Sequence, residues 1–317
     1  MRLVVALGGN ALLHRGERPD ATLQLEHVRA AAEVLAPLAN EHELVICHGN
    51  GPQVGLLALE SEADRSISRA YPFDALGAQT QGMIGYWLSQ SLHNAGALGP
   101  VLSVVTQVRV DARDPAFAHP SKFVGSVYGY EEAANLAAAR GWSVAADGPG
   151  WRRVVPSPEP QAIVELSSLA ALLARRTTLI CGGGGGAPVV ELAGQLRGVE
   201  AVVDKDLTSA LLAISLQADR LLILTDVSAV MLDYGTAEQT ALRHVGLDEL
   251  GAMSFPAGSM GPKVEACRRF VRATGKVAAI GSIADTAGLL TGDAGTQITA
   301  DRPGSRVLHA ATTSSHL

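Results

Sequence analysis

Aromatic side chains are scarce in this 317-residue chain. Phe, Trp and Tyr together make up 4% of it, although 47% of its residues are hydrophobic. The core must therefore be built from aliphatic side chains, which is typical of a parallel sheet that helices cover on both faces. The length fits one large α/β domain or two closely joined lobes.

Basic residues are also few. Lys and Arg number 25 against 31 Asp and Glu, which gives a net charge of −6, and the sequence contains no basic run. This composition argues against nucleic-acid binding. Because the overall charge does not attract anions, an anionic substrate would have to be held by local charges.

Cysteines and long apolar stretches are equally limited. Cys47, Cys181 and Cys267 form neither a CxxC pair nor a metal-binding spacing, so we expect buried, reduced thiols. No stretch approaches the roughly 18 apolar residues of a membrane span, and the N-terminus does not fit a secretory signal. We expect a cytoplasmic protein that does not associate with membranes.

Strand-like and helix-like segments alternate along most of the chain. The patterns predict strands over residues 3–7, 44–47, 101–110, 178–181, 201–203, 221–225 and 277–280. They predict helices over residues 22–39, 53–64, 74–93, 131–140, 168–176, 207–217 and 262–273. This order indicates a largely parallel sheet covered on both sides by helices.

Two regions depart from the alternation. Residues 111–160 are rich in proline and polar residues, but Trp142 and Trp151 need something to pack on, so we expect an inserted subdomain. Residues 301–317 form a polar tail, and the unpatterned stretch from Arg306 is expected to fray.

Two glycine-rich turns each follow a predicted strand: Gly8-Gly9-Asn10 and Gly49-Asn50-Gly51. Such turns leave backbone N–H groups free to bind an anion, and the second turn precedes a helix, whose N-terminus also attracts anions. One Gly-Gly pair alone would indicate no more than an ordinary turn. The spacing from Gly49 to Gly55 is not that of a dinucleotide fingerprint, and the chain has no Walker A motif.

Lysines and acids in the sequence could complete a phosphate site. Lys122 lies in the insertion, Lys205 where a strand meets a helix, and Lys263 at a helix start beside glycines. A lone lysine is usually solvated, but lysines at such ends can neutralise phosphate oxygens. Asp204 and Asp226 could bind Mg²⁺ or orient the lysines. Asp226 could equally cap the following helix or turn, whereas Asp204 is the stronger candidate because it directly precedes Lys205.

The glycine turns, Asp204, Lys205 and Lys263 belong to longer motifs that run through the chain in a fixed order. The motifs are VALGGNA from Val5, HGNGPQVG from His48, TQGMIGY from Thr80, GWRRVVPSP from Gly150, CGGGG from Cys181, GVEAVVDKD from Gly198 and PAGSMGPKVEA from Pro256. Over residues 2–299 the chain resembles the carbamate kinase branch of the amino-acid kinase superfamily.

The resemblance implies an α/β fold: an open three-layer αβα sandwich with a mainly parallel sheet and a protruding inserted subdomain. It implies one kinase domain, with the acceptor in an N-terminal lobe (1–195) and the nucleotide in a C-terminal lobe (196–300). The implied activity is reversible, Mg²⁺-dependent phosphoryl transfer between ATP and carbamate, with ADP and carbamoyl phosphate as the other pair. A homodimer is also implied.

The resemblance assigns roles to individual residues. Lys122 matches a lysine on the protruding subdomain, Lys205 and Lys263 match nucleotide-side lysines, and Asp204 matches the acid that organises them. The residues assigned to the nucleotide site also include Asp226, Tyr234 and Met260. The glycine loops are assigned to the acceptor, and no protein ligand for the metal is assigned.

Ala6 separates branches of the superfamily. Acetylglutamate, aspartate and uridylate kinases typically have a lysine two residues before the first glycine, where this chain has Ala6. The resemblance implies that Lys122 supplies this charge instead. Direct in-line transfer is expected, because carbamate is already an anion and needs no general base, so His48 is expected to brace its loop. A kinase for another small acid and a non-catalytic ligand sensor are the alternatives.

Overall fold

The structure is a computed structural model, and it describes residues 1–9, 12–13, 17–256, 258–300 and 306–309. Its largest sheet runs in the order β13-β14-β16-β15-β12-β1-β2-β9-β3, with β17 added beside β14. At its centre, β12 (Arg220–Thr225), β1 (Arg2–Leu7), β2 (Glu43–His48) and β9 (Thr178–Ile180) are parallel. The carboxyl ends of these strands therefore meet at one edge, where crossover sheets usually bind ligands.

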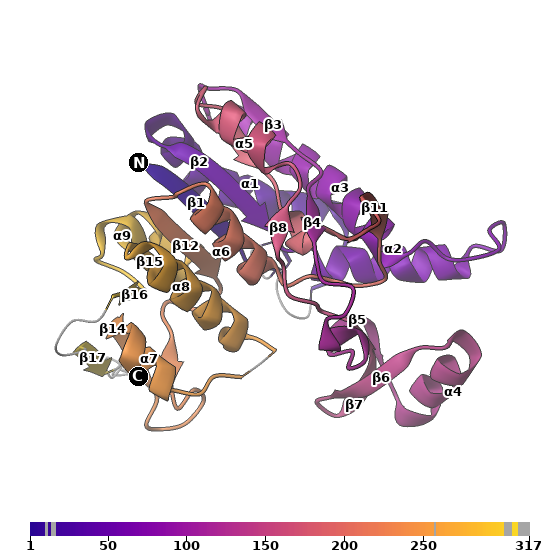
Figure 1. Cartoon of the computed structure of the whole chain (residues 1–317). Coiled ribbons are helices and arrows are strands. Elements are labelled where there is room, and N and C mark those ends of the chain that lie inside the picture. The colour runs from indigo at the N-terminus through magenta and orange to yellow at the C-terminus, as the bar shows by residue number, and fades with distance from the viewer. Residues whose placement is uncertain (10–11, 14–16, 257, 301–305, 310–317) are drawn as a thin grey trace.

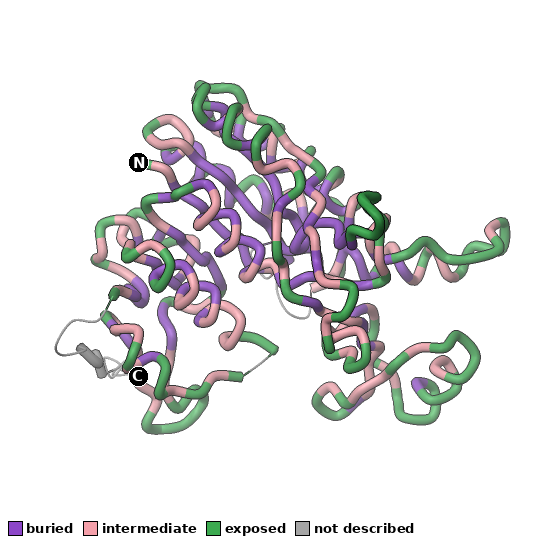
Figure 2. The backbone as a smooth tube through the Cα atoms, viewed as in Figure 1, coloured by how far each residue is buried: buried purple, intermediate pink, exposed green. Residues whose placement is uncertain are grey.

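Both faces of this sheet are buried. Along β1, Leu3, Val5 and Leu7 pack with α1 and α3, whereas Val4 and Ala6 belong to the core on the opposite face, with α5, α6 and α8. Both layers are filled mainly by aliphatic residues, with Phe270 of α8 as a buried aromatic exception, and the buried backbone follows the central strands (Figure 2). The predicted α/β sandwich with a mainly parallel sheet is confirmed.

The predicted helices are all present, with bounds shifted by a few residues. The longer ones are α1 (Ala21–Glu41), α2 (Gly51–Ala63), α3 (Phe73–Asn94), α4 (Tyr130–Arg140), α5 (Leu166–Leu173), α6 (Lys205–Ser215) and α8 (Met260–Thr274). The short helices α7 (Leu247–Ala252) and α9 (Thr286–Thr291) were not predicted. Each of these spans six residues, too few to show a helical period in the sequence.

The strand predictions need several corrections. Residues 101–110 form two strands, β3 (Val101–Ser103) in the main sheet and β4 (Gln107–Arg109) in a second sheet with β8 (Ala162–Ile163). Residues 201–203 are not a strand. The second sheet instead contains a hairpin of β10 (Ala187–Leu192) and β11 (Gln195–Gly198), which was not predicted.

The C-terminal part of the main sheet also contains more strands than predicted. Beside β15 (Val277–Ser282) lie β16 (Thr296–Thr299), β14 (Thr240–Gly246) and β13 (Met231–Leu232). The expectation of a frayed stretch is wrong for its first part, because β17 (Arg306–His309) pairs antiparallel with β14. The other residues of the stretch, 310–317, lie outside the described part of the chain.

The insertion stands off the main body (Figure 1). It contains β5 (Lys122–Tyr128), β6 (Ser143–Asp147) and β7 (Gly150–Val155) as an antiparallel sheet in the order β5-β7-β6, together with α4. The rings of Trp151 and Tyr130 pack edge to face, with centroids 5.2 Å apart. The indole of Trp142 has the guanidinium groups of Arg140 and Arg153 over it, at 4.9 and 4.7 Å.

Among the described residues, no helix combines the length and the apolar character that crossing a membrane requires.

Candidate functional site

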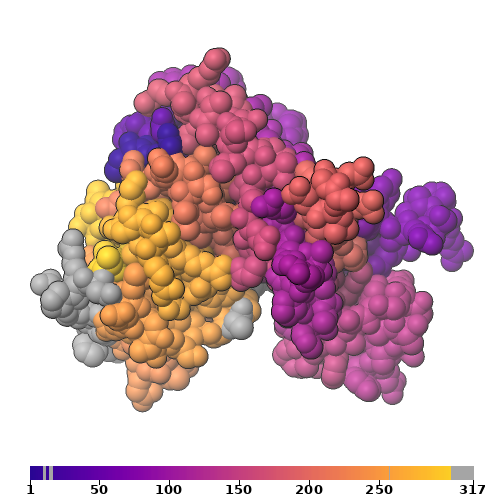
Figure 3. Space-filling view, viewed as in Figure 1, coloured from indigo at the N-terminus to yellow at the C-terminus, as the bar shows by residue number. Residues whose placement is uncertain are grey.

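A cavity of about 490 Å³ lies at the carboxyl edge of the central strands, where the insertion approaches the C-terminal half. The space-filling view shows the molecule hollowed between these two parts (Figure 3). The predicted site residues that line this cavity are Gly8, Gly9, Gly49, Asn50, Gly51, Lys122, Asp204, Lys205, Asp226, Tyr234, Met260 and Lys263. Asn10 lies outside the described residues. Segments that are distant in sequence thus meet in one place.

The two glycine loops touch each other through their backbones. The N–H of Gly8 donates to the carbonyl of Leu224 at 2.8 Å, and the N–H of Gly49 donates to that of Leu7 at 3.0 Å. A Cβ atom added to Gly49 would lie 2.9 Å from the nitrogen of Gly9, which is closer than side chains approach. Glycine is therefore required where the loops meet.

The five glycines at 182–186 support the second loop. A Cβ on Gly183 would overlap the ring of His48, and one on Gly184 would overlap the side-chain amide of Asn50. The amide nitrogen of Asn50 donates to Thr80 Oγ1 at 2.8 Å. These glycines allow two backbone segments to pack together and hold the loop in place.

His48 is buried beneath this loop and does not line the cavity. Its Nδ1 donates to the carbonyl of Gly49 at 3.0 Å. Burial lowers its pKa to about 4, despite this hydrogen bond, which acts in the opposite direction. A neutral imidazole packed against glycine is suited to bracing the loop.

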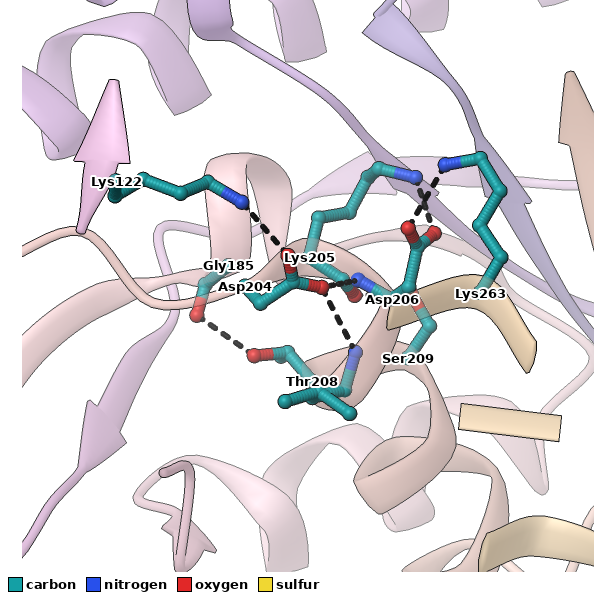
Figure 4. A network of polar contacts seen from close by, with 9 residues as sticks. Lys122, Gly185, Asp204, Lys205, Asp206, Thr208, Ser209 and Lys263 are labelled. Atoms are coloured by element: carbon teal, nitrogen blue, oxygen red, sulfur yellow. Dashed lines mark hydrogen bonds and ion pairs between the residues drawn. The ribbon is translucent and has the colours of Figure 1, made fainter. Parts of the chain in front are cut away.

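Two carboxylates at the start of α6 organise the lysines of the cavity (Figure 4). Asp204 caps the helix, because its Oδ1 accepts hydrogen bonds from the N–H groups of Asp206 and Leu207 at 2.9 and 3.3 Å. Its other oxygen, Oδ2, accepts a hydrogen bond from Lys122 Nζ at 2.7 Å. Asp204 thus links the insertion to α6.

Asp206 binds the other two lysines. Its oxygens lie 2.5 Å from Lys205 Nζ and 2.9 Å from Lys263 Nζ, and its side chain is only 5% exposed. Burial alone would raise the pKa of Asp206, but the two ammonium groups outweigh it and hold the pKa well below its usual range. Asp206 is therefore ionised at neutral pH.

Burial acts on the two lysines as well. It lowers the pKa of Lys205 from its ordinary value, and the charge of Asp206 only partly opposes this shift. For Lys263, burial also favours the neutral form, but Asp206 outweighs it and raises the pKa. The carboxylate of Asp206, placed between the two ammonium groups, thus stabilises the charges of Lys205 and Lys263 although both side chains are largely buried.

Asp206 was missed as a site residue in the sequence. It lines the cavity and binds both Lys205 and Lys263, yet an acid in the first turn of a helix is usually explained by the helix dipole. Its position directly after Lys205 is a usable signal, because Asp204 and Asp206 flank that lysine.

Apolar side chains also line the cavity. In the C-terminal half of the chain they include Val227, Ala229, Met231, Phe255 and Met260, together with Tyr234, whose side chain is accessible to solvent. These side chains could contact a planar, apolar group, while the lysines could bind phosphates. The lining thus suits a nucleotide.

The model of the amino acid kinase family matches residues 1–282. The chain belongs to this family. It is 51% identical to a carbamate kinase of Rhizobium meliloti (strain 1021), over 94% of this chain and 93% of that protein. It is 49% identical to a carbamate kinase of Haemophilus influenzae, over 94% of this chain and 97% of that protein. Within the family, the chain belongs with the carbamate kinases.

A solved structure agrees with this placement. The carbamate kinase from Giardia lamblia bound to AMP-PNP has a TM-score of 0.87 and is 39% identical, over 95% of this chain and 98% of that one. The chain is thus a kinase, an enzyme that transfers phosphoryl groups.

The buried imidazole generates a prediction about stability. Because the folded protein excludes a proton that the unfolded chain binds below about pH 6.5, the free energy of unfolding should fall as the pH drops from about 6.5 to 4. The part due to His48 should be on the order of 3 kcal/mol. Urea unfolding at pH 7 and pH 4.5 measures it, and His48→Gln should weaken the pH dependence.

His93→Gln is the matched control, because it removes an imidazole from an exposed position near the end of α3. If wild type and His48→Gln lost the same stability between the two pH values, the buried, neutral state of His48 would be wrong.

Proposed function

We propose that the chain catalyses reversible, Mg²⁺-dependent phosphoryl transfer between ATP and carbamate, with ADP and carbamoyl phosphate as the other pair. One observation carries the proposal: three lysines from three separate segments converge on the cavity that also contains both glycine loops. Phosphoryl transfer needs mainly positioning and charge neutralisation, which such a set supplies.

The positive charge of Lys122, which comes from the insertion and not from β1, supports carbamate over larger acceptors. Ala6 is fully buried in β1, so this strand brings no charge to the cavity. Lys122 enters from the insertion instead, and its Nζ lies 2.7 Å from Asp204. We infer that Lys122 replaces the strand lysine typical of related kinases with other acceptors.

We place the nucleotide on the C-terminal side, within residues 196–300. Lys205 and Lys263 would bind its phosphates, and Tyr234 and Met260 would lie against the adenine. The acceptor would sit on the N-terminal side, within residues 1–195, against the backbone N–H groups of Gly8-Gly9 and Gly49-Asn50-Gly51. The phosphoryl group would then pass between the two sides at the level of Lys122.

We infer a single in-line step. A carbamate oxygen forms a bond to the γ-phosphorus of ATP while the bond from that phosphorus to the β–γ bridging oxygen breaks, and ADP leaves with the electron pair. Carbamate is already an anion, so no proton has to be removed. Lys122 would exchange its bond with Asp204 for one with the transferred group, whose negative charge it neutralises.

Mg²⁺ fits this site as a partner of the nucleotide. In the described part of the chain, no three His, Cys, Asp or Glu residues are grouped so as to hold a metal ion. Mg²⁺ commonly keeps waters and binds substrate phosphates with one or two carboxylates, and Asp204 and Asp226 line the cavity. When bound, the ion would neutralise charge on the nucleotide phosphates.

ATP formation from ADP and carbamoyl phosphate tests the proposal. The purified protein should form ATP with Mg²⁺ present, and far less when acetyl phosphate replaces carbamoyl phosphate. A luciferase readout measures the product. Equal rates with both donors would favour a kinase for another small acid, and no ATP with either would favour a non-catalytic ligand sensor.

Lys122→Ala in the same assay tests the role of the insertion. Loss of a contact made to the transferred group should lower kcat by about 10²-fold or more. Lys276→Ala is the control, because Lys276 is also paired with an aspartate, Asp219, at 3.0 Å but does not line the cavity. A kcat within about threefold of wild type for Lys122→Ala would remove Lys122 from the mechanism.

We also propose a homodimer. Strand β3 ends the main sheet in the described part of the chain, and Leu98, Leu102 and Val105 in and beside it are exposed. Exposed apolar side chains at a sheet edge favour association with another chain. In sedimentation velocity the protein should show twice the mass of the chain, and Leu102→Asp should shift it toward the monomer.

Leu192→Asp on β10 is the matched control, because it places the same charge at an equally exposed leucine in the second sheet. A wild-type protein that sediments as a monomer would overturn the homodimer. A Leu102→Asp protein that stays fully dimeric would overturn the assignment of this edge.

A further inference from the structure

Arg153 lies where the insertion meets the main body. It belongs to β7, and its side chain is 16% exposed. Its Nη1 donates to Glu62 Oε1 at 2.8 Å, and its Nη2 donates to Glu200 Oε1 at 3.3 Å. Its guanidinium also lies over the ring of Phe73, at 4.9 Å from the centroid. One side chain of the insertion therefore contacts two separate segments of the main body by hydrogen bonds and packs on a third.

Each of these partners is linked to the cavity. Glu62 is near the end of α2, the helix that begins at Gly51 in the second glycine loop. Glu200 accepts a hydrogen bond from the N–H of Phe73 at 2.9 Å and lies four residues before Asp204. Arg153 thus ties the insertion to the acceptor loop and to the segment that carries the lysine partners.

Glu62 is suited to being a fixed anchor. Its side chain is 11% exposed, and it also accepts a hydrogen bond from Arg140 Nη1 of α4 at 2.6 Å. Burial raises the pKa of Glu62, while the charges of Arg153 and Arg140 oppose the shift. A largely buried carboxylate with two arginines from the insertion resists separation, because parting them would leave a charge unpaired.

Strand β5, which carries Lys122, rests directly on α2. A Cβ atom on Gly55 of α2 would lie 2.9 Å from the nitrogen and Cα of Gly125 in β5. In the sheet of the insertion, Val124 of β5 pairs with Arg153 of β7, and Lys122 pairs with Val155. Because β5 and β7 are paired, a shift of Arg153 would also shift Lys122.

The ion pair of Lys122 with Asp204 cannot hold the insertion during the reaction. Lys122 is 38% exposed, so the pair is partly open to solvent. In the proposed step, Lys122 leaves Asp204 for the transferred group. The contacts of Arg153 lie outside the cavity lining and can persist while this exchange takes place.

We propose that Arg153 is a positioning residue, which holds the insertion so that Lys122 reaches the transferred phosphoryl group. The inference rests on the proposed function. Arg153 acts through Lys122 and touches no substrate. If Lys122 is displaced by about 1 Å, the rate can fall about 10²-fold. Lys205 and Lys263 lie on α6 and α8, outside the insertion, so binding of the nucleotide should not depend on Arg153. Loss of Arg153 should therefore lower kcat and leave the KM for ADP unchanged.

A double-mutant cycle tests this role. Arg153→Met, Lys122→Met and the double variant are assayed for ATP formation from ADP and carbamoyl phosphate. Arg153→Met should lower kcat by about tenfold or more, with the KM for ADP within about twofold. In the Lys122→Met background the same change should cost less than about threefold, because the group that Arg153 positions is already gone. Arg109→Gln, which breaks an arginine–glutamate pair between β4 and β10, is the control.

Several results would overturn the role of Arg153. These are a wild-type kcat in Arg153→Met, additive losses in the double variant, or a rise in the KM for ADP that accounts for the whole effect. If wild type itself formed no ATP, the proposed function would fail first, which keeps the two failures distinct.

A second pair of variants covers the case in which Arg153→Met does not fold. Arg153→Lys keeps the charge but not the forked geometry, and Glu62→Gln keeps the shape of the anchor without its charge. Both should show a smaller fall in kcat without a rise in the KM for ADP. The tryptophan fluorescence of the protein should change as well, because the indole of Trp142 lies against Arg153. Wild-type kcat in both folded variants would contradict the proposal.

Discussion

The structure of this site depends on two carboxylates at the start of one helix. Asp204 and Asp206 bind three ammonium groups that arrive from the insertion, from α6 itself and from α8. Buried lysines are costly unless they are paired, and burial favours the neutral form of Lys205 in particular. Because the acids balance this cost, the cavity can hold three ammonium groups, each paired with a carboxylate, before any substrate is bound.

The rest of the fold fixes the groups around this pairing. Parallel strands bring both glycine loops to one edge of the sheet, and the glycines at 182–186 allow the second loop to pack without side chains in between. The insertion carries Lys122 across the cavity, and Arg153 ties that insertion to α2. Phosphoryl transfer would then require little movement beyond exchanging a carboxylate for a phosphoryl oxygen at each lysine.

Much of this architecture could be predicted from the sequence, because aliphatic strands, glycine turns and amphipathic helices alternate with clear periods. The failures have physical causes. Residues 101–110 were predicted as one strand because apolar Val104 and Val105 continue the pattern between β3 and β4, with no glycine or proline to mark the break. The β11 strand is exposed throughout and so has no alternating pattern. Arg153 depends on Glu62, a partner far away in sequence that no local pattern can indicate. For Asp206 the neighbouring Lys205 was a local signal, but the pairing with Lys263, 57 residues away, could not be predicted.

In the proposed mechanism, Lys122 binds the transferred phosphoryl group while Lys205 and Lys263 bind the nucleotide phosphates beside it. The most direct measurement is a crystal structure with ADP, Mg²⁺, carbamate and a planar fluoride mimic of the transferred phosphoryl group. We expect Lys122, Lys205 and Lys263 within hydrogen-bond distance of the mimic or the adjoining phosphate, with Lys122 released from Asp204. A bound mimic with Lys122 still on Asp204 and out of reach would contradict it.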